Sequence, residues 1–103
     1  MPTVNSVAAR KFGFLHLGVN FEGVDIEAYR PAVEKVLNKA QDWLRYAPNW
    51  WLIYTSRSLE VWQKELVEVP GMKEKSWVIC EVNITNRTGW MYKSEWEWIN
   101  KER

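Results

Sequence analysis

Cysteine is scarce in this chain. Cys80 is the only one among 103 residues, so an intrachain disulfide is excluded and a reducing compartment fits best. Long apolar runs are missing too, because no segment approaches the roughly 20 apolar residues that a membrane-spanning helix requires. Residues 1–10 hold no run of signal-peptide length. We therefore expect a cytoplasmic protein with no membrane partner and with a flexible N-terminus over residues 1–10.

A strong charge of one sign is also absent. Lysine and arginine number 14 against 13 for aspartate and glutamate, which gives a net charge of +1. A balanced chain has no global attraction to nucleic acid or to an anionic membrane, although a local basic patch is compatible with it. The composition therefore favours neither kind of partner.

The short motifs of several common chemistries are missing. There is no glycine-rich phosphate loop, no Cys-x-x-Cys pair and no Gly-x-Ser-x-Gly motif. His16 is the only histidine, and the alternation of the strands predicts that it shares the helix-free face of a sheet with Glu81. One histidine and one carboxylate supply neither a nucleophile nor a third ligand, so we predict no catalytic residue, no metal and no cofactor.

Tryptophan, in contrast, is abundant. Eight tryptophans are more than one small core hides, because this residue is rarely buried completely. We therefore expect several indole rings at the surface, where they are enriched among residues that carry binding affinity. The eight are Trp43, Trp50, Trp51, Trp62, Trp77, Trp90, Trp96 and Trp98.

The length fits one domain, 1–103, built around a single core. Apolar residues occupy alternate positions in residues 11–20, which is typical of a strand with one buried face. Pro31 suits the first turn of a helix, and the apolar spacing after it predicts a helix that ends near Gln41.

The aromatic stretch DWLRYAPNWWLIY in the middle of the chain has two interpretations. The helical pattern can be extended so that one helix ends at Tyr46. The alternative is a hairpin, with strands at 43–46 and 50–55 and a turn at Pro48-Asn49. We prefer the hairpin, because tryptophan and tyrosine pack well across neighbouring strands.

The second half of the chain repeats the order of helix and strand. Ser58 can cap a helix, with Glu60 favourable in its first turn. Residues 76–84 then alternate as a final strand, and we expect Cys80 to share its inward face with Val78 and Val82.

This order of elements predicts an α+β fold, a ferredoxin-like βαββαβ sandwich. In that fold a four-stranded antiparallel sheet carries two helices on one face, and the first strand lies between the third and the fourth. An aromatic, Trp-rich C-terminal extension follows at 85–103. Ser94 as a cap and the spacing of Trp96 and Ile99 favour a short helix there, whereas the alternation of residues 95–98 is typical of a strand. We prefer the helix.

Several segments give the chain a resemblance to a known family. They are the strand end at Val19-Asn20, the segment Trp43-Leu44-Arg45-Tyr46 followed by Trp51-Leu52-Ile53, and the ending from Gly89-Trp90-Met91 to Trp98-Ile99. Through them the chain resembles the small ferredoxin-like proteins related to the second CRISPR-associated adaptation protein, including those labelled SinR-family. The resemblance implies a homodimer, an association with nucleic acid, a setting in a phage or in bacterial antiviral defence and, in some members, a metal-dependent nuclease.

The nuclease members of that family act through an aspartate at the end of the first strand. The matching position here is Asn20, whose amide cannot supply the anionic oxygen that a Mg²⁺ site needs. Glu22 and Asp25 are the nearby carboxylates that would have to replace it. We therefore favour a protein that is not an enzyme.

Two sets of residues are candidates for binding. The first is an aromatic interface for a protein partner or a second copy of the chain: Trp50, Trp90, Tyr92, Trp96 and Trp98. The second is a basic rim that would hold phosphates while bases stack on nearby rings: Arg10, Lys11, Arg45, Arg57, Arg87 and Lys93.

These sets define two hypotheses for the function. We favour a non-enzymatic, homodimeric interaction protein that binds a protein partner through its aromatic surface. Inhibition of a host nucleoprotein complex would be one example of such a function. The alternative is DNA or RNA binding, or a residual metal-dependent nuclease.

Overall fold

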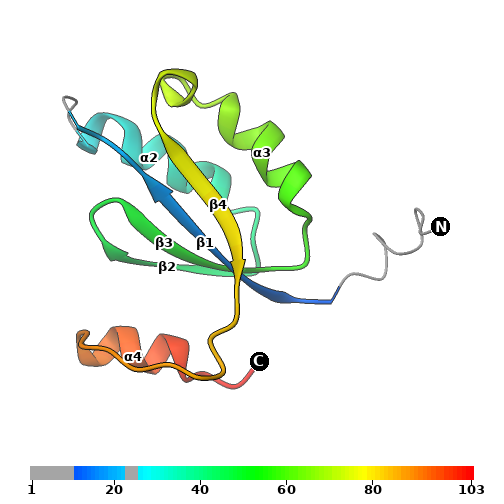
Figure 1. The fold of residues 1–103 in the computed structure, drawn as a ribbon, viewed down its shortest axis with the longest axis vertical. Coiled ribbons are helices and arrows are strands. Elements are labelled where there is room, and N and C mark those ends of the chain that lie inside the picture. The colour runs from blue at the N-terminus through cyan, green and yellow to red at the C-terminus, as the bar shows by residue number, and fades with distance from the viewer. Residues whose placement is uncertain (1–10, 23–25) are drawn as a thin grey trace.

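The computed structural model describes residues 11–22 and 26–103 of the chain. Its elements in chain order are β1 (Gly13–Val19), α2 (Ile26–Leu37), β2 (Asp42–Ala47), β3 (Trp50–Thr55), α3 (Leu59–Val67), the 3-10 helix η1 (Met72–Glu74), β4 (Trp77–Val82) and α4 (Lys93–Ile99). The fold is thus a small α+β structure (Figure 1). The expectation for residues 1–10, including Arg10, and the candidate ligand Asp25 lie outside the described residues.

The four strands form one antiparallel sheet in the order β2-β3-β1-β4. The register places Leu17 of β1 between Trp51 of β3 and Ile79 of β4. The first strand therefore lies between the third and the fourth, as the sequence predicts.

The aromatic stretch in the middle of the chain is a hairpin, with Pro48 and Asn49 at its turn between β2 and β3. Asn49 also ties this turn to β1. Its carbonyl accepts the backbone N–H of Val19 at 3.1 Å, and its Nδ2 donates to the carbonyl of Val19 at 2.9 Å. The interpretation as one helix ending at Tyr46 is wrong, because the strand pairing supplies the backbone hydrogen bonds of this stretch.

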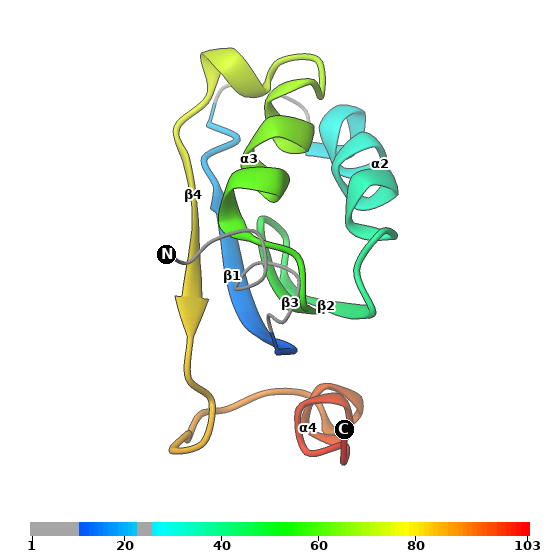
Figure 2. The same cartoon turned by 90° about the vertical axis from the view of Figure 1, so that its right-hand side faces the viewer.

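The hydrophobic core lies between the sheet and the helices α2 and α3, which cover one face of it (Figure 2). Alternation along β1 and β3 directs every second residue to that face. Trp51 and Trp62 are the largest of the fully buried side chains. The sheet and the two helices together supply Leu15, Leu17, Val19, Val33, Leu37, Trp51, Ile53, Trp62 and Leu66.

Helix α2 begins earlier than the sequence predicts. It starts at Ile26, so Pro31 lies inside the helix rather than in its first turn, and it ends at Leu37, ahead of the predicted end near Gln41. A proline at this depth removes one intrahelical N–H donor. Its ring is on the exposed side of the helix. The prediction placed the start wrongly because it gave proline its commonest helical position.

The two later helices differ in how they begin. Ser58 caps α3 as predicted, and its Oγ accepts the backbone N–H of Val61 at 3.3 Å. The structure confirms a helix in the C-terminal extension, but Ser94 does not cap it. The N-cap is Tyr92, whose backbone N–H donates to the carboxylate of Glu95 at 3.1 Å. A glutamate three residues after the cap thus satisfies a backbone donor at this helix start.

The faces of β4 are the reverse of those predicted. Cys80 lies opposite His16 of β1, and it is exposed together with Val78 on the face away from α2 and α3. Trp77 and Ile79 pack against the core instead. The residues on each face of β4 are largely apolar, so the sequence pattern does not indicate which face is buried. The pairing of β4 with β1 determines it. The prediction of an inward Cys80 is therefore wrong.

Helix α4 lies on the other side of the sheet, the face away from α2 and α3, which we call the open face (Figures 1 and 2). The ring of Trp98 meets Phe14 of β1 edge-on, with centroids 6.1 Å apart. None of the helices in the described part of the chain is both long and apolar enough to cross a membrane.

Candidate aromatic interface

Three rings from three neighbouring strands gather at the hairpin end of the open face. They belong to His16 of β1, Tyr46 of β2 and Trp50 of β3. Their centroids are 5.6 Å apart for His16 and Tyr46, 6.4 Å for His16 and Trp50, and 5.9 Å for Tyr46 and Trp50. Nε2 of His16 and the hydroxyl of Tyr46 share a hydrogen bond. Strand pairing fixes this cluster, because it brings side chains of the same face side by side.

Partial burial shifts the pKa values of two polar groups in this cluster. Burial lowers the pKa of His16 from its ordinary value of 6.5 and raises the pKa of Tyr46 from 10.0. Both changes favour the uncharged form of the side chain. A partner that covers the cluster at neutral pH therefore does not have to desolvate a charge there.

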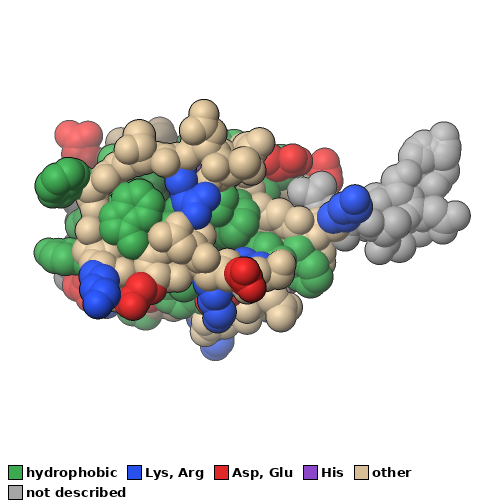
Figure 3. Space-filling model, turned by 90° about the horizontal axis from the view of Figure 1, so that it is seen from below, with side chains coloured by type: hydrophobic (Ala, Val, Ile, Leu, Met, Phe, Trp, Pro, Cys, Tyr) green, Lys and Arg blue, Asp and Glu red, His purple; other side chains and the backbone are tan. Residues whose placement is uncertain are grey.

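An open groove of about 740 Å³ adjoins the ring cluster. Its walls come from the hairpin and from the segment that leads into α4: Tyr46, Ala47, Trp50, Thr88, Gly89, Trp90, Met91, Tyr92 and Glu95. We call Tyr46, Trp50, Trp90 and Tyr92 the aromatic surface. Seen from below, the molecule shows hydrophobic side chains in several places, with charged ones between them (Figure 3).

Exposure separates the predicted interface residues into two groups. Trp50 is 46% exposed, Tyr92 80% and Trp90 100%, and all three line the same groove. Trp96 and Trp98 are half-buried. The structure thus brings three of the five predicted rings together, while Trp98 packs on the sheet.

Trp98 and the C-terminal residue attach α4 to the open face. The guanidinium carbon of Arg103 lies 4.3 Å from the ring centre of Trp98, and 4.9 and 5.7 Å from those of Tyr54 and Phe14. Its Nη1 is 3.1 Å from a carboxylate oxygen of Asp42. These contacts cover the part of the open face near β2 and leave the part near β4 uncovered.

Two of the predicted basic residues bind acidic groups away from the groove. Arg45 faces α2, where its Nε lies 3.5 Å from a carboxylate oxygen of Glu34. Arg57 donates to both carboxylate oxygens of Glu65, at 2.8 and 3.1 Å. The hydrogen bond from Arg57 is also the main cause of the lowered pKa of Glu65. The structure therefore does not bring these two arginines together with the exposed rings.

The other basic residues are more dispersed still. Arg87 donates to the carbonyl of Ile84 at 2.8 Å and to Asn100, whereas Lys11 and Lys93 are exposed. Only Lys93, the first residue of α4, directly follows a residue of the aromatic surface. Nucleic-acid binding through this set stays a prediction.

The prediction that His16 and Glu81 share the helix-free face of the sheet is wrong. Glu81 pairs with Leu15 in the register, so its side chain projects to the helix side, whereas His16 belongs to the open face. The error is the same reversal of β4 that misplaces Cys80. Oδ1 of Asn20, at the end of β1, accepts the backbone N–H of Glu22 at 2.9 Å and closes a local turn.

The part of the chain that the structure describes holds no cluster of three or more His, Cys, Asp and Glu side chains suited to a metal ion. The sequence did not single out Tyr46 as a binding residue. No local signal placed it, because the pairing of β2 with β3 shifts register between Arg45 and Ala47 and alternation does not hold there.

Fold and site define a class: a small α+β protein with a half-covered sheet and an exposed aromatic groove. Comparison of the chain with protein-family models, with curated proteins and with solved structures finds no match. The resemblance to CRISPR adaptation proteins therefore stays a prediction that depends on the quoted segments alone.

Proposed function

We propose that this chain is a non-enzymatic interaction protein of ferredoxin-like architecture that binds a protein partner through its aromatic surface. The element order and the strand order β2-β3-β1-β4 support the architecture. The observation that carries the function is the grouping of Trp50, Trp90 and Tyr92, all exposed, around one groove.

The energetics favour binding at this groove. Leaving large rings in water forgoes the hydrophobic stabilisation that burial provides, and a tryptophan or tyrosine at the centre of an interface is often worth about 2 kcal/mol or more. Tyr46 and His16, which share a hydrogen bond, lie beside these rings. Because this hydrogen bond already restrains the two side chains, covering them with a partner would cost little additional side-chain entropy.

An affinity capture experiment tests the proposal. Immobilised wild type is compared with a Trp50→Ser, Trp90→Ser double variant and with Lys101→Ala, in nuclease-treated lysate from the cells that make the chain. We expect a protein that wild type and Lys101→Ala retain and the double variant loses. Trp90 is fully exposed and Trp50 is 46% exposed, so we expect the double variant to stay folded, and its thermal melt checks this.

Nucleic-acid binding is the second candidate. The observation in its favour is the sequence Trp90, Met91, Tyr92, Lys93, in which two exposed rings precede an exposed lysine, since bases stack on such rings while cations hold phosphates. A gel-shift titration with labelled single-stranded DNA and RNA at physiological salt tests it. Retention of nucleic acid that is lost in the double variant, with no protein captured, would overturn the first candidate. Unchanged substrate across Mg²⁺ and Mn²⁺ titrations would remove the nuclease form.

A further inference from the structure

Strand β4 has a free side. It is at the end of the sheet, and no strand in the described ranges pairs with its outer edge. The backbone N–H of Asn20 donates to the carbonyl of Ser76 at 2.8 Å. In an antiparallel pair, every second residue of a strand hydrogen-bonds to the neighbouring strand, and the residues between them direct their N–H and C=O groups to the other side. Val78 and Cys80 therefore hydrogen-bond to β1, whereas the N–H and C=O groups of Trp77, Ile79 and Glu81 are directed to the free edge.

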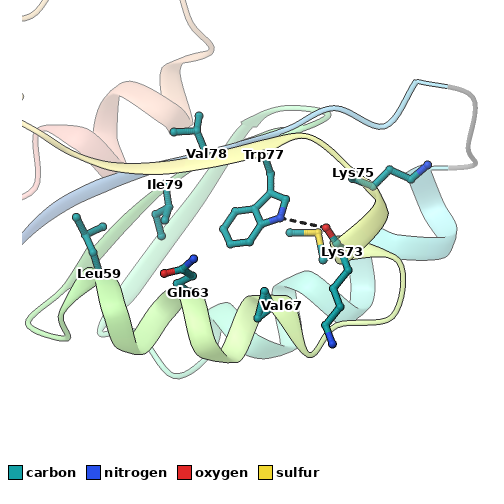
Figure 4. Close-up of a pocket in the computed structure, with 9 residues that line it drawn as sticks. Leu59, Gln63, Val67, Lys73, Lys75, Trp77, Val78 and Ile79 are labelled. Atoms are coloured by element: carbon teal, nitrogen blue, oxygen red, sulfur yellow. Dashed lines mark hydrogen bonds between the residues drawn. The ribbon is translucent and has the colours of Figure 1, made fainter.

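A groove of about 570 Å³ runs between this edge and helix α3 (Figure 4). Trp77 and Ile79 extend from β4 toward the helix, while Leu59, Gln63 and Val67 face them from α3. Nε1 of Trp77 donates to the carbonyl of Met72 at 3.1 Å, which fixes the indole in the groove wall. The edge therefore combines directed backbone groups with an apolar recess.

Charge differs between the two ends of β4. Of the described residues that line the groove, the charged ones are Lys73 and Lys75, which precede the strand. Glu81 is at the opposite end of the strand and is exposed. Lys75 has extended backbone, with φ −112° and ψ 150°, so it continues the line of the strand and shares a face with Glu81. A strand edge with a cation at one end and an anion at the other is complementary to itself when two copies run antiparallel.

We propose that a second copy of this chain binds here, by antiparallel pairing of the two β4 strands about a twofold axis at Ile79. This register places Trp77 opposite Glu81 of the second copy and uses the outward groups of residues 77, 79 and 81 in both chains. Lys75 then lies diagonally across from Glu81 of the second copy, within reach of a long side chain. The two four-stranded sheets become one sheet of eight strands.

The same register accounts for apolar exposure on the open face. Val78, which is 59% exposed, comes to lie opposite Cys80 of the second copy, and Cys80 opposite Val78. The two α3 grooves meet at the seam, where the Ile79 side chains cover one another. Trp90 and Tyr92 lie at the hairpin groove. Trp50 also borders a hollow with Ser76, Trp77 and Val78, but the pairing uses the outer edge of β4, so the inference goes beyond the proposed function and does not depend on it.

A cysteine cross-link tests the register directly. Val78→Cys puts a thiol opposite Cys80 of the second copy, in a pair without mutual hydrogen bonds, whose Cα atoms lie about 4.5 Å apart as a disulfide requires. We expect mild oxidation of this variant to give a covalent dimer, and none from wild type or from Val82→Cys, whose opposite residue is Ser76. Absence of the covalent dimer, or equal cross-linking of Val82→Cys, would overturn the proposal.

Sedimentation equilibrium of the reduced protein supplies a second readout. Lys75→Glu and Glu81→Lys should each weaken the dimer by about tenfold, because each replaces two attractions with two repulsions across the twofold axis. The double charge exchange should restore it, and Trp90→Ser should leave it unchanged. A wild type that is monomeric at all concentrations, or a dimer that only Trp90→Ser disrupts, would show that β4 does not join two copies.

Discussion

At the scale of single residues, Trp51 combines burial of its apolar ring with a hydrogen bond for its one polar group. Its side chain is fully buried, and its Nε1 donates to a carboxylate oxygen of Glu34 on α2 at 3.0 Å. Arg45 lies 3.5 Å from the same oxygen and contributes a balancing charge. Local sequence does not predict the link to Glu34, because it requires the packing of α2 on the sheet.

Leu17 is the residue at which we expect core packing to be most sensitive. It is fully buried between Trp51 and Ile79, so Leu17→Ala should lower the free energy of unfolding by about 2–5 kcal/mol through the lost burial and the cavity left behind. Urea denaturation measures this loss. Val78→Ala is the matched control on the exposed side of β4, with an expected change within about 0.5 kcal/mol in dilute protein. Equal losses in both variants would contradict the burial of Leu17.

His16 should make the stability depend on pH near neutrality. Burial lowers its pKa in the folded chain from the ordinary 6.5, so the unfolded chain takes up the proton first as the pH falls. The stability is therefore fully present above the unfolded pKa and decreases as the pH drops from there toward the lower folded pKa. In His16→Gln, we expect a smaller difference between the unfolding free energies at about pH 7.5 and about pH 5.5. The same difference in both proteins would show that His16 is not the group responsible.

At the scale of elements, local chemistry made the hairpin, α3 and the C-terminal helix predictable. Pro48 and Asn49 carry turn chemistry, Ser58 is a helix cap, and the spacing of the last aromatic residues is helical. The faces of β4 were not predictable, because Val78 and Ile79 belong to opposite faces and are both apolar. Long-range register with β1, which no local signal carries, decides between them.

Helix α4 should be the most easily detached of the described helices. It has seven residues, too few to be stable alone in water, and it depends on side chains that pack on the open face. Arg103→Ala removes the guanidinium from three rings and from Asp42, so the amides of α4 should exchange with solvent faster while those of β1 keep their protection. Hydrogen exchange with mass spectrometry measures both sets. Lys101→Ala is the control, and unchanged exchange of α4 in Arg103→Ala would contradict the attachment.

At the scale of the whole molecule, the sheet separates two surfaces that differ in character. The hairpin end carries exposed rings around an open groove, whereas the β4 edge carries backbone groups and opposite charges. The sequence indicated the first through its excess of tryptophan, and Trp50, Trp90 and Tyr92 do meet there. It could not indicate the second, because an edge strand is defined only by which strands lie beside it.

Association through β4 predicts that thermal stability depends on protein concentration. A dimer that dissociates on unfolding is stabilised by mass action, so the Tm of wild type should rise as the concentration is raised. The rise should be smaller in Lys75→Glu and should return in the Lys75→Glu, Glu81→Lys double variant. Differential scanning calorimetry over a range of concentrations measures it, and a Tm that is constant in all three proteins would contradict the association.

The strand order also constrains synthesis of the protein. Among the described strands, β1 comes first along the chain, yet it occupies the interior of the sheet, and one of its two neighbours, β4, comes last. The sheet of a nascent chain therefore cannot close until residues 77–82 have left the ribosome. Until then, β1 lacks its neighbour β4 on one edge, so that edge stays open to other chains for as long as the synthesis of residues 56–82 takes.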